Sequence, residues 1–95
     1  MSGRVCVVIE HCEAWDDYES YDAVKAVAGN PTIAENLIEG YKNELIDKTY
    51  KEGNIATETT EVGRDVTVRV EQKRNCMTFQ YTYYWTIEEF KIIGS

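Results

Sequence analysis

The chain has 95 residues, of which 43% are hydrophobic and 12% aromatic, and its formal net charge is −7. This length provides for one core, so we expect a single folded domain over residues 1–95. A general nucleic-acid binder needs excess Lys and Arg to neutralise phosphates, so the acidic balance argues against direct nucleic-acid binding and favours a partner protein with a basic surface.

The chain begins with an apolar segment that we interpret as a buried strand, Arg4–His11. Val5–Ile9 is a continuous apolar run, which is typical of a strand covered on both faces. The run is too short to span a membrane or to serve as the apolar region of a signal peptide. We therefore expect a cytoplasmic protein with no membrane segment.

An acidic segment separates this strand from a second one. Cys12–Glu19 is predicted to be a loop, because Asp16 and Asp17 are short acidic residues that satisfy backbone donors in turns. Ser20–Ala28 regains the character of a strand. A hairpin that joins the two strands is the simplest interpretation.

One helix is predicted after Asn30, which suits the N-cap, with Pro31 at the first helical position. Thr32 and Glu35 form a competing capping box, and Gly53 is expected to end the helix. The apolar positions recur at spacings of three and four and should face the sheet: Ile33, Ala34, Leu37, Ile38, Tyr41 and Leu45. The opposite side carries Glu35, Glu39, Lys42, Asn43, Asp47 and Lys48.

The C-terminal half is predicted to hold two or three strands. Ile55–Val62 is polar and Thr-rich, and fits either an edge strand or a mobile loop; we favour the loop. Asp65–Lys73 alternates clearly. Its inward set is Val66, Val68 and Val70, and its outward set is Thr67, Arg69 and Glu71.

After a turn at residues 73–75, Cys76–Ile87 is predicted to return as a strand. Its inward set is Met77, Phe79, Tyr81, Tyr83, Trp85 and Ile87. Phe90 and Ile92 are out of step with this set, so we expect either a bulge at residues 88–89 that restores the register or a short helix from Thr86. The order of elements predicts an α+β fold, an antiparallel sheet of four to five strands with one helix packed on one face.

Glu10–Asp22 is the most informative segment, because it holds six carboxylates, three aromatic residues and no Lys or Arg. Carboxylates steer a basic partner toward the surface, and aromatic rings supply contact area. We therefore predict a partner-binding surface made of Glu13, Trp15, Asp16, Asp17, Tyr18, Glu19, Tyr21 and Asp22. The alternative is an exposed acidic loop that only keeps the domain soluble.

The sequence contains no catalytic motif that stands out, so we expect no enzyme, no cofactor and no metal. The three cysteines, an odd number, indicate free thiols in a reducing compartment. Cys12 with His11 is the one candidate for a thiol redox or metal site. Neighbouring strand residues point to opposite faces, however, and the close cysteine pair of zinc motifs is absent.

An aromatic segment, Tyr81–Trp85, follows a basic hairpin that contains Arg69 and Arg74. Aromatic residues beside cations can form a stacking platform for nucleic-acid bases. Because the whole chain is acidic, we favour a role in the core and at interfaces.

The order of strand, acidic loop, strand, helix and strand, with the closing motif Tyr84-Trp-Thr-Ile-Glu-Glu-Phe90, resembles small accessory proteins of phages and prophages. The resemblance covers most of the chain. It implies a non-enzymatic factor in the host cytoplasm that, as anti-CRISPR proteins do, inhibits a basic, nucleic-acid-handling host protein. A self-associating structural protein, such as a homodimer that pairs through the Thr-rich or C-terminal edge, is the remaining alternative.

Overall fold

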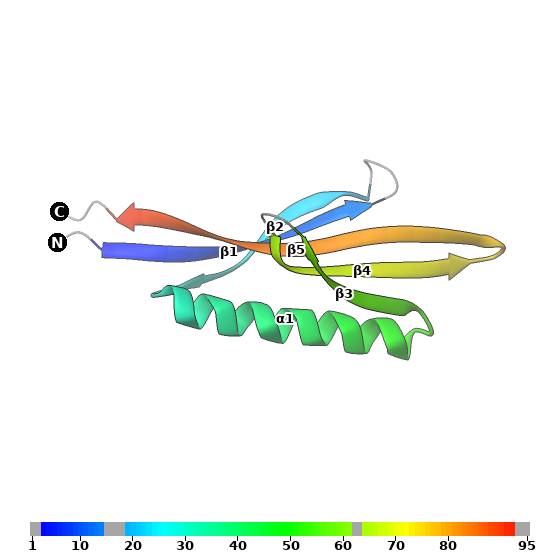
Figure 1. The fold of residues 1–95 in the computed structure, drawn as a ribbon. Helices are drawn as coiled ribbons and strands as arrows, with labels where there is room; N and C mark the ends of the chain where they lie inside the picture. The colour runs from blue at the N-terminus through cyan, green and yellow to red at the C-terminus, as the bar shows by residue number, and fades with distance from the viewer. Residues whose placement is uncertain (1–2, 15–18, 62–63, 93–95) are drawn as a thin grey trace.

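The structure is a computed structural model that describes residues 3–14, 19–61 and 64–92. Within these residues one helix packs on one five-stranded antiparallel sheet, which confirms the predicted α+β fold (Figure 1). The elements in chain order are β1 (Gly3–Ala14), β2 (Tyr21–Ala28), α1 (Pro31–Lys51), β3 (Ile55–Glu61), β4 (Arg64–Arg74) and β5 (Met77–Ile92).

The sheet has the strand order β2-β1-β5-β4-β3, so that β2 and β3 form its edges. The predicted hairpin of β1 and β2 is present, with a register shift between Val8 and Ile9. β1 also pairs with β5 along its whole length, from Gly3 opposite Ile92 to Ala14 opposite Tyr81. This pairing brings the first and last described residues of the chain to the same end of the molecule.

The core lies between the sheet and α1. Val8 and Val68 are fully buried, and Trp85, Ala34 and Ile38 pack with them. Side-chain alternation explains which strand residues enter the core, because every second residue of a strand faces the helix. Burial of these apolar side chains is the main force that holds the helix on the sheet.

The ends of α1 follow from local chemistry. The side chain of Asn30 accepts a hydrogen bond from the backbone N–H of Ile33 at 2.9 Å, and Pro31 occupies the first turn. Asn30 is therefore the N-cap, as predicted. Gly53 follows the helix with φ 79°, a left-handed conformation that glycine adopts without strain, and this confirms the predicted end.

Two residues of α1 lie on the other side from the one predicted. Lys42 was expected to be outward, but it is buried in line with Ala34 and Ile38. Its long stem lies against the protein while the ammonium group reaches carboxylates at the rim. Ile33 was expected to face the sheet, but it is 48% exposed because it lies about a quarter turn away from that row.

The prediction of a loop at residues 55–62, which we favoured, is wrong, because Ile55–Glu61 forms the edge strand β3. It pairs with β4 from Ile55 opposite Glu71 onward. Two features fix the strand: Ala56 is buried, and the hydroxyl of Tyr50 donates to its carbonyl at 2.9 Å. Threonine also favours strands, so the polar composition was a misleading signal.

Both predictions for the end of β5 are wrong. The strand continues through Glu88 and Glu89 opposite Val7 and Cys6, without a bulge or a helix. Phe90 therefore lies on the face away from α1 and is 49% exposed. The out-of-step apolar residues mark a second apolar face and not a change of register.

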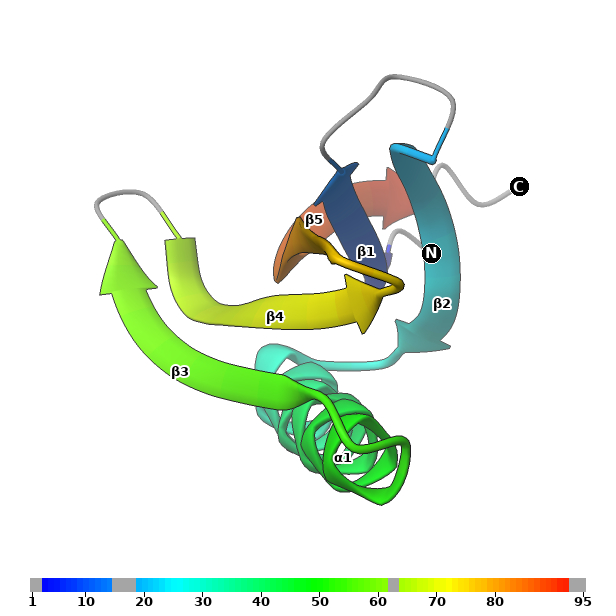
Figure 2. The same cartoon turned by 90° about the vertical axis from the view of Figure 1, so that its right-hand side faces the viewer.

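Two further residues differ from the predicted alternation. Met77, expected inward, is exposed at the hairpin tip, and Thr67, expected outward, is fully buried. Figure 2 shows β3 and β4 curving away from α1. Thr67 lies between Thr59 of β3 and Tyr84 of β5 in the sheet, and its side chain is fully buried there.

Candidate functional site

The predicted partner-binding surface surrounds the connection between β1 and β2. Trp15, Asp16, Asp17 and Tyr18 lie outside the described residues, so the structure gives no account of them. The other four members flank this gap, and Glu13, Tyr21 and Asp22 are exposed. We call residues 10–22 the acidic hairpin end.

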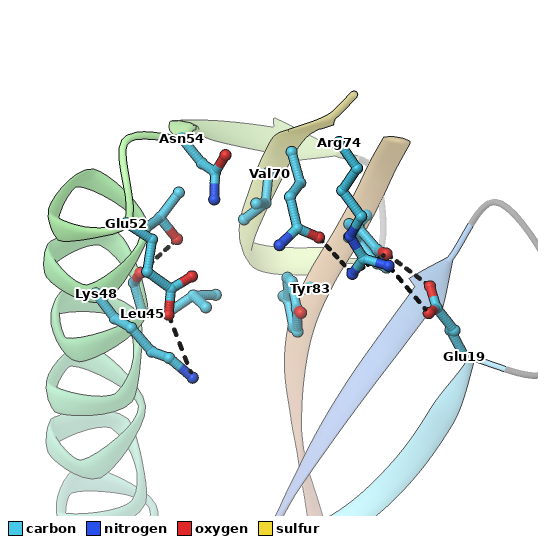
Figure 3. A pocket seen from close by; sticks show the side chains of 11 residues that line it. Glu19, Leu45, Lys48, Glu52, Asn54, Val70, Arg74 and Tyr83 are labelled. Carbon is cyan, nitrogen blue, oxygen red and sulfur yellow. Dashed lines mark hydrogen bonds and ion pairs between the residues drawn. The ribbon is translucent and has the colours of Figure 1, made fainter. Parts of the chain in front are cut away.

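Glu19 is tied to the opposite hairpin of the sheet. The hydroxyl of Tyr81 donates to its Oε2 at 2.6 Å, and Nη1 of Arg74 lies 3.8 Å from its Oε1 (Figure 3). Arg74 in turn donates to Gln72 at 2.7 Å. These contacts fix the C-terminal flank of the undescribed residues to the β4–β5 hairpin, and they offset the charge of one predicted binding carboxylate.

Glu10 organises a second set of contacts on the face toward α1. Its Oε1 accepts a hydrogen bond from Nε1 of Trp85 at 3.1 Å, and its Oε2 accepts one from the hydroxyl of Tyr21 at 2.7 Å. Partial burial, followed by this bond to Glu10, raises the pKa of Tyr21 above its ordinary value. The Tyr21 hydroxyl therefore remains a donor at neutral pH.

Asp22 lies on the opposite face of the sheet, beside His11. Nδ1 of His11 is 2.6 Å from Oδ1 of Asp22, and its Nε2 is 2.8 Å from Oγ1 of Thr86. The imidazole stacks on Tyr84 with ring centroids 4.5 Å apart. His11 is thus held by a polar and aromatic cluster that positions the start of β2.

The structure separates Cys12 from His11. Cys12 is 3% exposed and faces α1, whereas His11 faces the other side. Burial raises the pKa of the Cys12 thiol, so the reactive thiolate is disfavoured. Among the described residues no cluster of three or more histidines, cysteines or carboxylates forms a metal site.

A cavity of about 400 Å³ opens between the C-terminal half of α1 and the β4–β5 hairpin (Figure 3). One wall holds Lys48 and Glu52, whose charged atoms are 4.0 Å apart, and the other holds Arg74 and Glu19. Each of these cations already has a carboxylate beside it. The charges of the lining largely cancel, which makes the cavity a poor site for a charged ligand.

Sequence reasoning missed Arg74 and Tyr81 as the groups that hold Glu19. A basic cluster around Arg74 was visible in the sequence, but the partner lies more than 50 residues away. Such a pair is created by the order of the strands and leaves no local pattern.

The comparisons with known proteins give no relative. No family model matches the chain, and neither a curated protein nor a solved structure matches it significantly. Among the described residues, no helix has the length and apolar character needed to cross a membrane.

Proposed function

We propose that the protein is a non-catalytic binding protein whose acidic hairpin end engages a basic surface on another protein. The proposal is supported by one combination of features: the segment carries carboxylates without Lys or Arg, and the residues that flank its centre are held by contacts with the sheet. Residues 10–22 contain no Lys or Arg, and Glu19, Tyr21 and Asp22 are anchored to separate parts of the sheet. Anchored flanks reduce the entropy that a binding segment loses on association.

The structure changes the roles expected within this surface. Glu19 contacts Arg74 and Tyr81, so its charge is engaged inside the molecule. Glu13 and Asp22 are exposed, and Asp16 and Asp17 add charge between them in the sequence. We assign the steering of the partner to these four carboxylates and a positioning role to Glu19.

The chemistry of the surface selects the class of partner. Proteins that handle nucleic acids present Lys and Arg to phosphates. An acidic protein that covers such a surface competes with the nucleic acid. We therefore propose an inhibitor of a nucleic-acid-handling protein. The resemblance to phage accessory proteins further implies that it is encoded by a phage or another mobile element and acts in the host cytoplasm.

The test is a charge reversal that leaves the anchors intact. The variant Asp16→Lys/Asp17→Lys is compared with Glu44→Lys/Asp47→Lys, which makes the same change of charge on exposed positions of α1. Partners are captured from a host lysate and identified by mass spectrometry. Affinity for the purified partner is then measured at two salt concentrations.

We expect the hairpin variant to lose at least about tenfold in affinity and the α1 variant to lose much less. We also expect wild-type binding to weaken as salt increases, because exposed charges are screened. Equal affinity of the hairpin variant and the wild type, with both folded by circular dichroism, would contradict the proposal.

A further inference from the structure

Within the part of the chain that the structure describes, the second half of β5 has a neighbouring strand on one side only. β4 pairs with β5 only from Met77 to Tyr84, whereas β1 pairs with it from Tyr81 to Ile92. Among the described residues, the backbone of 85–92 therefore has no strand on the side away from β1. Figure 1 shows this part of β5 running beside β1, past the start of β4.

This edge is accessible and partly apolar. All residues of 88–92 are exposed, and Phe90 and Ile92 retain 49% and 47% of their accessible surface. They lie on the face away from α1, which continues to Val24 and Val27 of β2, 66% and 63% exposed. β2 pairs with β1 only from Cys6 onward, so the last part of β5, residues 90–92, belongs to a two-stranded ribbon, which is marginal on its own. An open edge is also a template for another strand.

We propose that β5 pairs with β5 of a second copy of this chain, as an antiparallel strand across a two-fold axis. Such an interface is isologous, so one surface must complement itself. The charged residues of this edge, Glu88, Glu89 and Lys91, favour one register of such a pair.

A two-fold axis perpendicular to the sheet places one residue opposite its own copy. An axis at Glu88, Glu89 or Lys91 places like charges directly opposite each other, which is destabilising. An axis at Phe90 instead stacks the two phenyl rings on the open face. The same register sets Glu89 opposite Lys91 of the other copy, twice by symmetry.

Two other apolar centres are less suitable. An axis at Ile87 would require Tyr84 to pair with Phe90 of the other copy, although Tyr84 already pairs with Thr67 of β4. An axis at Ile92 would not set Glu89 opposite Lys91, so the two attractive charge pairs would be lost. Phe90 is therefore the centre that charge complementarity and the existing sheet both allow.

The surroundings of the edge fit this arrangement. A cavity of about 540 Å³ lies beside Trp85 and Ile87, with Ile38 of α1 and Val66 of β4 in its lining. The segment that precedes the pairing region therefore borders a cavity that it shares with α1 and β4. Within one copy Arg4 lies 3.6 Å from Glu89, so in the dimer Glu89 would lie between two cations.

The experiment exchanges the two charges of the proposed pair. Mass and dissociation constant are measured by light scattering and sedimentation equilibrium for wild type, Glu89→Lys, Lys91→Glu and the double variant. Glu44→Lys and Lys73→Glu serve as controls, because they make the same charge changes at exposed positions away from the edge. The wild type should reach twice the 10.9 kDa monomer mass as concentration increases.

Each single variant should weaken the dimer about tenfold or more, because two attractive pairs become repulsive. The double variant should restore dimerisation. A mixture of the two single variants should form a heterodimer, since one copy then carries two lysines and the other two glutamates. A monomeric wild type, a dimer indifferent to both single variants, or a mixture that stays monomeric would overturn the proposal.

Discussion

Replacing Lys42 should show that its stem stabilises the protein more than its charge does. The residue is 7% exposed on the core side of α1, and its Nζ lies 2.7 Å from Glu39 and 3.2 Å from Glu58. The hydrogen bond to Glu39 raises the pKa of Lys42, so the ammonium stays charged at neutral pH. Both carboxylates are more than half exposed, at 57% and 53%.

The magnitudes follow from this geometry. An ion pair with an exposed carboxylate contributes at most about 1 kcal/mol, and desolvation of the ammonium offsets part of it. Lys42→Met keeps most of the buried stem, so we expect a loss of less than about 1 kcal/mol in unfolding free energy. Lys42→Ala loses the ion pairs and also removes the three methylene groups beyond Cβ, which contribute about 0.8 kcal/mol each. Together these losses should lower the unfolding free energy by about 3 kcal/mol.

The assay is urea unfolding followed by circular dichroism, with the slope compared among variants to confirm a common transition. Lys48→Met and Lys48→Ala are the matched controls, because Lys48 is 73% exposed and 4.0 Å from Glu52. Both controls should change stability by less than about 0.5 kcal/mol. If Lys42→Met cost as much as Lys42→Ala, the ion pairs would be holding α1 and our reasoning would be wrong.

Three further results are expected. In the native protein a thiol reagent should modify exposed Cys76 quickly, and buried Cys6 and Cys12 only on unfolding; modification of all three at one rate would contradict the described burial. Burial raises the pKa of Cys12 and of Tyr83 above their ordinary values of 9.0 and 10.0. The unfolded chain then loses these protons first, so unfolding free energy should be constant near neutral pH and fall above about pH 9, as denaturant curves at several pH values would show. Thr67→Val should raise the unfolding free energy by about 1 kcal/mol, because the buried Oγ1 of Thr67 has no hydrogen-bond partner. A lower midpoint temperature in thermal unfolding would instead reveal a partner of this hydroxyl or a packing defect.

The parts of the fold that local signals control were predictable. The apolar run at Val5–Ile9 and the alternation at Val66–Val70 gave the strands, and Asn30 with Pro31 gave the start of α1. Each of these signals operates within a few residues. The α+β class followed because one amphipathic helix among strands must cover a sheet face.

The features that were missed depend on contacts between distant segments. Nothing near Lys42 in the sequence indicates that Glu58 of β3 will lie beside it, so helical position alone placed it outward. The polar composition of residues 55–61 suggested a loop. An edge strand can nevertheless form there, because Ala56 is the apolar residue that β3 buries against the rest of the protein. For the candidate site, the sequence identified the acidic segment, but the bond from Tyr81 to Glu19 depends on strand order.

The two proposed surfaces lie at opposite ends of β1, and this has a consequence for binding. β1 runs from Gly3, beside the free end of β5, to Ala14, at the acidic hairpin end. Val5 lies opposite Phe90, and the nine steps from Val5 to Ala14 at about 3.3 Å per residue separate the two surfaces by roughly 30 Å. Pairing through β5 would therefore leave both acidic hairpin ends outward and distant from each other. A dimer could then bind a partner with repeated basic sites through two contacts, and the effective concentration of the second would raise the apparent affinity. Glu89→Lys should therefore weaken binding to such a repeated partner but not to a single basic site, whereas the reversal at Asp16 and Asp17 should weaken both.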